Sequence, residues 1–298
     1  MLRSLPPLIK APIAFCLFVL NTVFWCSVLF LFTFVKILAP PGRWRIRCSR
    51  WLTGIAENWN TGNEWITDLT QDIEWDIQVD AELSPNASYL LLANHQSWVD
   101  IVVLERVFNR RVPFIRFFIK KQLFWVPFLG PSWWALDFPF MSRYSEEYLR
   151  KHPERRGQDL VTARKRCERF RLMPTSVLIF AEGTRFREEK RRRLASPFTH
   201  LLPPKAGGIS TVMEVMGDQF ERVLDVTIVY PEGETSFFAL FSGRLKRVVV
   251  RVRTLEMPEG LVPGAARSED SYEKLKDWVR GAWEKKDTLI AQLVGNAG

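Results

Sequence analysis

Residues 89–108 read YLLLANHQSWVDIVVLERVF, in which a short apolar run leads through a polar turn into a second, longer apolar pattern. Tyr89–Ala93 has the length and composition of a buried strand, and Trp98–Phe108 has a helical pattern. A strand that passes through a short turn into a helix is the repeating unit of layered α/β domains. The stretch therefore predicts the α/β fold class.

The same alternation continues on both sides of this stretch. Further apolar runs predict strands at Ile73–Val79, Phe114–Ile119, Val177–Phe180, Val223–Val229 and Val248–Val252. Helical patterns lie at Glu146–Leu149, Leu160–Phe170 and Ile209–Met216. Near the C-terminus, apolar side chains recur at helical spacing with charges between them, at Tyr272, Leu275, Val279 and Trp283. We expect residues 268–298 to form a surface helix with one face packed on the domain.

The N-terminal part of the chain has the features of a membrane segment. Residues 11–35 contain no charged side chain, and as a helix they would reach roughly 38 Å, against a hydrocarbon core of about 30 Å. Two positive charges precede this run and five follow it within residues 1–50, which predicts that the main domain lies on the cytoplasmic side. A single membrane helix is expected, with a re-entrant hairpin that breaks near Asn21 as the alternative.

The net charge of +9 is unevenly distributed, with one basic zone in residues 1–50 and another in residues 141–193. Such zones fit anionic lipid, a phosphorylated substrate or nucleic acid. No nucleic-acid-binding motif accompanies them, and a charge-free apolar run does, so we expect no nucleic-acid partner. The four cysteines form no CxxC pair, which indicates neither a zinc site nor a disulfide framework.

His95 is a candidate general base. It is one of three histidines and follows directly after a predicted strand. Transfer of an acyl group to an alcohol needs a base that works near neutral pH, and that base needs a carboxylate to orient it. Asp100 can supply this carboxylate if His95 lies in the turn and Asp100 in the first turn of the helix. The alternative is that Ser97 and Asp100 form a capping box, which would leave Asp100 as a cap and His95 as a loop residue.

A candidate anion site follows the strand predicted at Val177–Phe180. Gly183 permits a close backbone approach, Thr184 offers a hydroxyl, and Arg185 offers a planar fork that suits phosphate. Lys205 precedes a predicted helix whose N-terminal amides favour an anion. The alternative is an ordinary turn followed by a solvated run of charges.

These motifs resemble those of the 1-acylglycerol-3-phosphate acyltransferase (lysophospholipid acyltransferase) family. Asn94, His95 and Asp100 are similar to its catalytic motif, and residues 180–185 to the motif that binds the acceptor's phosphate. Two more blocks are similar to its second and fourth motifs: Lys120–Leu123 with Pro127, Gly130 and Phe140–Arg143, and then Val226–Pro231. All four blocks occur in the family's order. Trp98–Asp100 and residues 201–208 look closest to a bacterial inner-membrane branch.

The resemblance implies a single glycerolipid-acyltransferase-like domain, with a mixed sheet flanked by helices, over residues 51–267. Residues 1–50 would be the membrane anchor. His95 would be the catalytic base and Asp100 its partner. The acceptor's glycerol phosphate would be held by substrate-binding residues Arg143, Glu182, Gly183, Thr184, Arg185 and Lys205. The donor would be acyl-CoA or acyl-carrier protein, with no metal and no other cofactor.

The implied reaction is transfer of a fatty acyl group to the sn-2 hydroxyl of 1-acylglycerol-3-phosphate, giving phosphatidic acid for phospholipid biosynthesis at the bacterial inner membrane. Alternatives are a lysophosphatidylglycerol or lysocardiolipin type of acceptor, or a non-catalytic membrane protein that binds lipid or acyl carriers. Three residues depart from the family's pattern, namely Gln122, Ala181 and Tyr230, where an acidic residue, proline and an aliphatic residue are usual. None of the three is expected to touch the proposed base.

Overall fold

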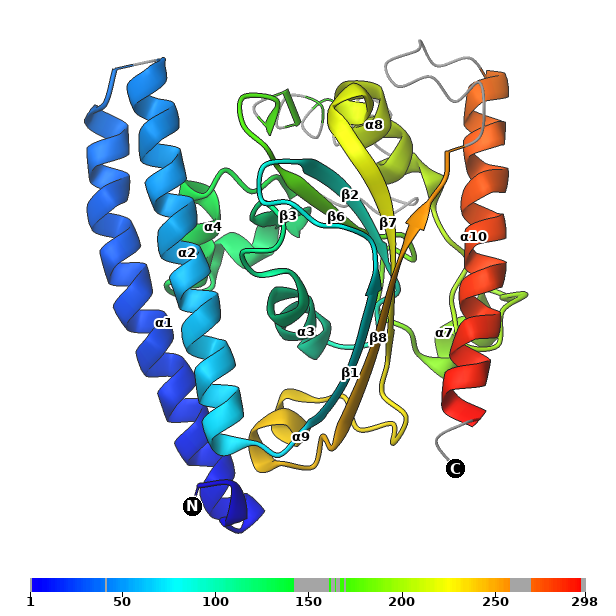
Figure 1. Ribbon diagram of the computed structural model, residues 1–298, viewed down its shortest axis with the longest axis horizontal. Coiled ribbons are helices and arrows are strands. Elements are labelled where there is room, and N and C mark those ends of the chain that lie inside the picture. Colours follow the sequence, from blue (N-terminus) through cyan, green and yellow to red (C-terminus); the bar gives the residue numbers. More distant parts are fainter. Residues whose placement is uncertain are drawn as a thin grey trace.

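The computed structural model describes residues 2–40, 42–141, 170–257 and 269–295, together with residues 161, 164, 167 and 168. At its centre lies a six-stranded mixed sheet with the strand order β1-β8-β7-β2-β6-β3 (Figure 1). In this order the strands are Glu74–Asp80, Arg247–Leu255, Phe220–Val229, Ser88–Ala93, Ser176–Phe180 and Ile115–Phe117. Neighbouring strands are parallel except for β7 and β8, which are antiparallel. The predicted α/β domain with a mixed sheet is confirmed.

One predicted strand differs from the structure. The apolar run Phe114–Ile119 is divided, because β3 ends at Phe117 and, after Phe118, the residues Ile119 and Lys120 form β4. β4 pairs with β5 (Phe140–Met141) in a separate two-stranded sheet. A change of sheet inside a continuous apolar run depends on a partner strand about 20 residues away, which periodicity does not report.

Helices cover both faces of the large sheet. On one face, α3 (Val99–Phe108) and α9 (Phe237–Ser242) pack on alternate residues of β2, β7 and β8. On the other face, α8 (Ala206–Met216) and α10 (Glu269–Gly295) pack on the intervening residues (Figure 1). Every residue of β2 from Tyr89 to Ala93 is therefore buried, which explains why its sequence is continuously apolar rather than alternating.

Two long antiparallel helices, α1 (Pro7–Leu38) and α2 (Arg43–Thr70), pack together beside α3 and α4 (Leu129–Ala135) (Figure 1). The alternative of a break near Asn21 is wrong, because α1 runs through this position without interruption. The Asn21 amide donates to the main-chain oxygen of Trp59 and to Oδ1 of Asn63, so it joins the two helices. The anchor was expected to end at residue 50, a position that lies inside α2.

Helix α1 contacts the α/β domain near both of its ends. Phe15 and Phe18 pack against Phe241 of α9, and Lys36 pairs with Asp137 at 2.7 Å. Its other side, called here the outer face of α1, exposes large apolar side chains: Leu8, Ile9, Val19, Leu20, Phe24, Leu31, Phe34, Val35, Ile37 and Leu38. The helix is long and apolar enough to cross a membrane. An exposed apolar surface of this extent is typical of a binding surface for lipid or protein.

The C-terminal helix α10 confirms the helix predicted near the C-terminus. Leu275, Val279 and Trp283 are buried against the sheet, whereas Tyr272 is 39% exposed. The predicted segment Glu146–Leu149 lies outside the described residues, and Leu160–Phe170 is described only in part. The remaining described helices are η1 (Leu2–Ser4), η2 (Lys121–Trp125), α7 (Glu188–Arg193) and η4 (Gly217–Gln219).

Candidate active site

The predicted site residues follow three neighbouring strands of the sheet. β2, β6 and β7 run parallel, so their carboxyl ends lie at the same edge. The loop after β2 carries His95, the turn after β6 carries Glu182 to Arg185, and Tyr230 follows β7 directly. In α/β proteins, ligands bind outside the carboxyl ends of the strands. The topology thus brings together segments that are up to about 130 residues apart in the sequence.

His95 and Asp100 form a hydrogen-bonded pair. Nδ1 of His95 lies 2.8 Å from Oδ2 of Asp100; the carboxylate is fully buried and the imidazole is 17% exposed. Asp100 lacks a proton to donate when it is ionised, so Nδ1 carries the hydrogen and Nε2 is left as the acceptor. Nε2 has no hydrogen-bond partner among the described residues. This arrangement lets Nε2 take a proton from a hydroxyl group in the site.

Asp100 also serves the loop that precedes α3. Its Oδ2 accepts hydrogen bonds from the main-chain amides of Gln96, at 2.6 Å, and Ser97, at 2.9 Å. The sequence offers two alternative roles for Asp100, as a cap of the helix or as the group that orients His95. The same carboxylate makes both sets of contacts. The helix itself begins at Val99, and the amide of Val99 donates to the hydroxyl of Ser97.

Two aromatic residues that the sequence did not single out as site residues complete the surroundings of this pair. The Tyr230 hydroxyl donates to Oδ1 of Asp100 at 2.7 Å. The ring of Phe180 stacks on the imidazole of His95, with centroids 3.9 Å apart. Among the described residues Tyr230 makes no hydrogen bond to the base itself, but it does to the carboxylate that orients the base. That departure from the family's pattern therefore bears directly on the pair.

Residues 94–98, between β2 and α3, are called here the catalytic loop. Asn94 fixes the start of this loop to strand β7. Its amide donates to the main-chain oxygen of Ile228 at 2.9 Å, and its Oδ1 accepts from the amide of Ile228 at 2.8 Å. Gln96 donates to the same oxygen. Because Asn94 is fully buried, these bonds replace the water that its amide group would otherwise need.

The Glu182 carboxylate joins the catalytic loop to the segment that contains Leu202. Oε1 accepts from the amide of His95 and Oε2 from the amide of Leu202, both at 2.9 Å. A third link is the bond from the amide of Phe186 to the oxygen of His95, at 2.7 Å. Burial raises the pKa of Glu182 to about 7. Both carboxylate oxygens accept hydrogen bonds from main-chain amides, so Glu182 holds the loops in place. The sequence instead predicts that Glu182 contacts the substrate directly.

Positive groups gather around the turn after β6. Gly183 has φ +69°, a conformation that favours glycine, and the Lys205 side chain lies next to its Cα. Thr184 accepts a hydrogen bond of 2.6 Å from Lys190, and the Arg185 guanidinium lies 5.0 Å from the centre of the Trp98 ring. The structure brings Gly183, Thr184, Arg185 and Lys205 together; Arg143 lies outside the described residues.

Lys190 adds a further cation that the sequence did not single out for this site. Partial burial lowers its pKa, and so do the neighbouring charges of Arg187, Arg185, Arg193 and Lys120. Like charges that crowd in this way favour binding of an anion, because an anion relieves their mutual repulsion. The arrangement is therefore suited to a phosphate group.

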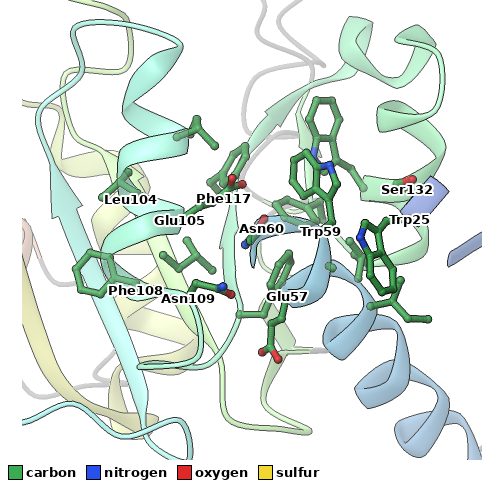
Figure 2. A pocket seen from close by; sticks show the side chains of 18 of the residues that line it. Trp25, Glu57, Trp59, Asn60, Leu104, Glu105, Phe108, Asn109, Phe117 and Ser132 are labelled. Atoms are coloured by element: carbon green, nitrogen blue, oxygen red, sulfur yellow. The ribbon is translucent and has the colours of Figure 1, made fainter. Parts of the chain in front are cut away.

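An apolar cavity of about 60 Å³ lies between the helical pair and α3, with further walls from β3, β6 and α4. Figure 2 shows Glu105 and Asn109 of α3 facing Asn60 of α2 across it. The apolar lining includes Trp25, Leu29, Ile55, Ile101, Leu104, Phe108, Phe117, Leu136, Phe138 and Leu178. Two of its lining residues are close in sequence to site residues: Ile101 follows Asp100 directly, and Leu178 lies two residues before Phe180 on the same strand face.

Comparisons with known proteins agree with this geometry. Residues 76–236 match the sequence model of a family described as Acyltransferase. The chain is 27% identical over 213 residues to 1-acyl-sn-glycerol-3-phosphate acyltransferase 3 of Arabidopsis thaliana, covering 65% of this chain and 54% of the relative. It is 27% identical over 182 residues to 1-acyl-sn-glycerol-3-phosphate acyltransferase delta of Mus musculus, covering 57% and 43%. The chain thus spans about half the length of these relatives.

A solved structure shares the fold. The crystal structure of PlsC, the 1-acyl-sn-glycerophosphate (LPA) acyltransferase of Thermotoga maritima, superposes with a TM-score of 0.54 at 16% identity, covering 94% of this chain and 98% of that one. The family match covers more than half of the 298 residues and includes His95, Asp100 and Glu182 to Arg185. The chain belongs to the acyltransferase family.

Proposed function

We propose that this protein transfers a fatty acyl group from a thioester donor to the sn-2 hydroxyl of 1-acylglycerol-3-phosphate, giving phosphatidic acid. The observation that carries the proposal is the position of the His95–Asp100 pair beside the cationic turn at Gly183–Arg185. Acyl transfer to a lysophosphatidic acid needs a base at the hydroxyl and a cation at the phosphate, one glycerol unit apart. The two relatives named above are 1-acyl-sn-glycerol-3-phosphate acyltransferases, which supports the same acceptor.

The chemistry assigns one step to each group. Nε2 of His95 takes the proton of the acceptor hydroxyl as its oxygen attacks the thioester carbonyl carbon. The carbon–sulfur bond then breaks, the ester remains on the acceptor, and the proton passes from His95 to the departing thiolate. Asp100 stabilises the imidazolium that forms between these two events. No acyl-enzyme forms, because the hydroxyl attacks the thioester directly.

The acyl chain of a substrate is assigned to the apolar cavity. A fatty acyl chain gains about 0.8 kcal/mol for each methylene group that leaves water, so a transferase needs an apolar cavity near its base. The lining of this cavity includes Ile101, which follows Asp100 in α3, and Leu178, which lies in the same strand as Phe180. Acyl-CoA and acyl-carrier protein both present the thioester at the end of a phosphorylated arm, and either fits the cations around Lys190.

Membrane attachment is assigned to the outer face of α1. Both ends of this helix contact the α/β domain, which favours a helix that lies along the surface of the bilayer over one that crosses it. The membrane is the bacterial inner membrane and the domain faces the cytoplasm, because the basic zone in residues 1–50 is attracted to the anionic lipid of the cytoplasmic leaflet. Labelling of a Thr288→Cys variant from outside intact cells would overturn this orientation, since Thr288 is exposed on α10.

The test is an acyl-transfer assay with purified protein. The acceptors are 1-oleoylglycerol-3-phosphate, lysophosphatidylglycerol and lysocardiolipin, each offered with palmitoyl-CoA and with palmitoyl-acyl-carrier protein. We expect the highest kcat/KM with 1-oleoylglycerol-3-phosphate and no transfer by a His95→Ala variant. A higher kcat/KM with another lysophospholipid would reassign the acceptor. Absence of transfer to all three acceptors would remove the enzymatic function, and equal transfer by His95→Ala would remove His95 as the base.

A further inference from the structure

The two oxygens of the Asp100 carboxylate have different partners. Oδ2 faces Nδ1 of His95 and the amides of Gln96 and Ser97, so its contacts all come from the catalytic loop. Oδ1 accepts one hydrogen bond, from the Tyr230 hydroxyl at 2.7 Å. Among the described residues, this is the only hydrogen bond that joins the Asp100 carboxylate to the segment after β7.

Tyr230 is held firmly in this position. It is 5% exposed, follows the last residue of β7 and packs in the same core as Tyr89, Val99 and Val103. Its main-chain oxygen accepts the amide of Gly233 at 3.0 Å, which closes a turn directly after it. Burial raises the pKa of Tyr230, and the charge of Asp100 raises it further, so the phenol stays protonated and donates. The hydroxyl is therefore a fixed donor aimed at Oδ1.

We infer that Tyr230 is a positioning residue for the acyl-transfer reaction, which holds the Asp100 carboxylate so that Oδ2 points at Nδ1 of His95. A carboxylate can rotate about its Cβ–Cγ bond, and a donor on the second oxygen opposes that rotation. The same donor draws charge toward Oδ1, which leaves less on the oxygen that pairs with the imidazolium. Tyr230 thereby limits how strongly Asp100 favours the protonated form of His95.

This inference rests on the proposed function, since the His95–Asp100 pair must act in acyl transfer. The titratable groups that face Asp100 are His95 on the catalytic loop and Tyr230 after β7, and Glu182 after β6 senses the charge of Asp100. Glu182 titrates near pH 7 in its own right. A comparison of variants that all keep Glu182 therefore isolates the effect of Tyr230.

The test compares Tyr230→Phe with Tyr89→Phe. Tyr89 is a matched control, because it is also buried, and its hydroxyl accepts a hydrogen bond from Ser84 near the start of β2, the opposite end from His95. For Tyr230→Phe we expect kcat to fall about 5- to 50-fold with both KM values within about twofold, since the lost bond joins a charged group. The acid limb of the kcat/KM profile should move to higher pH, because a less stabilised Asp100 holds the imidazolium more strongly.

A double-mutant cycle decides whether Tyr230 acts through Asp100. In an Asp100→Asn background, Tyr230→Phe should change kcat less than about twofold, because the partner of the hydroxyl is already altered. An equal loss in both backgrounds would overturn the inference, and so would an unshifted acid limb, a kcat equal to that of Tyr89→Phe, or a rise confined to the acceptor's KM. If the wild-type protein transfers no acyl group, the proposed function fails. If it does and Tyr230→Phe behaves like wild type, only the inference fails.

Discussion

The main-chain amide of His95 donates a 2.9 Å hydrogen bond to Oε1 of Glu182, while Oε2 of the same carboxylate accepts the amide of Leu202. One buried side chain therefore joins the loop of the base, the cationic turn and the segment that leads to Lys205. The distance between the base and the phosphate site depends on this junction. Substrates that must meet both sites lose reaction rate when the two loops move apart.

Glu182→Gln should disrupt this junction. Glutamine has one accepting oxygen, so one of the two buried amides would face an NH₂ group. An unsatisfied buried donor costs about 1–3 kcal/mol, and we expect a lower melting temperature together with a lower kcat. Circular dichroism melting and initial-rate kinetics check both effects. A normal melting temperature with a raised acceptor KM would instead support the direct substrate contact expected from the sequence.

Asp100→Asn should lower both stability and activity. The carboxylate accepts two main-chain amides and the Tyr230 hydroxyl and pairs with His95, all in a fully buried place. An asparagine cannot accept at all these positions, and its NH₂ group would meet a donor. The measurements are the melting temperature and kcat, with His95→Ala as the reference for loss of the base, for which a fall of about 10²–10⁴-fold is expected. A variant with reduced stability and full turnover would leave Asp100 as a helix cap only.

Local patterns were sufficient to predict much of the sheet. The runs at β2, β6, β7 and β8 are apolar because helices cover both faces of the sheet, and this burial is what the sequence reports. Helix α2 escaped prediction because its buried positions include polar residues. Asn60, Asn63 and Thr67 are buried there, so the apolar stripe that marks a packed helix is interrupted.

Long-range partners could not be predicted in the same way. Tyr230 looked like a departure in an otherwise aliphatic strand end, and its bond to Asp100 exists only because β7 and β2 are neighbours. The alternation of strands and helices predicts a layered domain but not the order of the strands. Lys286 is a second example, since it lies among exposed charges on α10 and yet is fully buried.

Lys286→Met should destabilise the protein strongly. The ammonium group pairs with buried Asp225 and donates to the main-chain oxygens of Val226, at 2.6 Å, and Leu92, at 3.3 Å. Methionine fills a similar volume but leaves this carboxylate with Arg253 as its remaining ion-pair partner. Removal of one partner from a buried ion pair typically lowers the free energy of unfolding by roughly 3–5 kcal/mol.

The control for this variant is Lys285→Met, at the neighbouring exposed position. Surface substitutions of this kind usually change stability by about 0.5 kcal/mol or less. Chemical denaturation in detergent micelles measures both variants. Equal stability of the two would mean that the charge of Lys286 contributes nothing net to the fold.

Stability should fall as the pH rises from about 5 to about 8. Burial raises the pKa of Glu182 to about 7 and that of Glu105 to about 8. In the unfolded chain both groups ionise near the usual glutamate value of about 4.3. Within this window the folded protein holds more protons than the unfolded chain, so the free energy of unfolding decreases with increasing pH. Melting temperatures at pH 5.5 and pH 8 check the sign, and Glu105→Gln should flatten the dependence.

Arg185 should recognise the acceptor phosphate, so Arg185→Lys and Arg185→Ala should raise the acceptor's KM far more than the donor's. The guanidinium lies over Trp98 beside the His95–Asp100 pair, in the turn that also carries Gly183 and Thr184. Its planar fork can bind two phosphate oxygens at once, whereas lysine offers a single charged point and loses the stacking surface. A charge-assisted hydrogen bond is worth ~1.5–3 kcal/mol, which corresponds to roughly 10–150-fold in KM when binding is near equilibrium.

A smaller loss in kcat should accompany the change in KM. The phosphate lies one glycerol unit from the reacting hydroxyl, so a loosely held phosphate presents that hydroxyl badly to His95. Arg192→Ala is the control, because Arg192 belongs to the basic run that follows Arg185 but lies on α7, is exposed and pairs with Glu188. A rise in the donor's KM alone would assign Arg185 to the phosphates of the donor. Kinetics identical to those of Arg192→Ala would show that Arg185 is only part of a solvated basic surface.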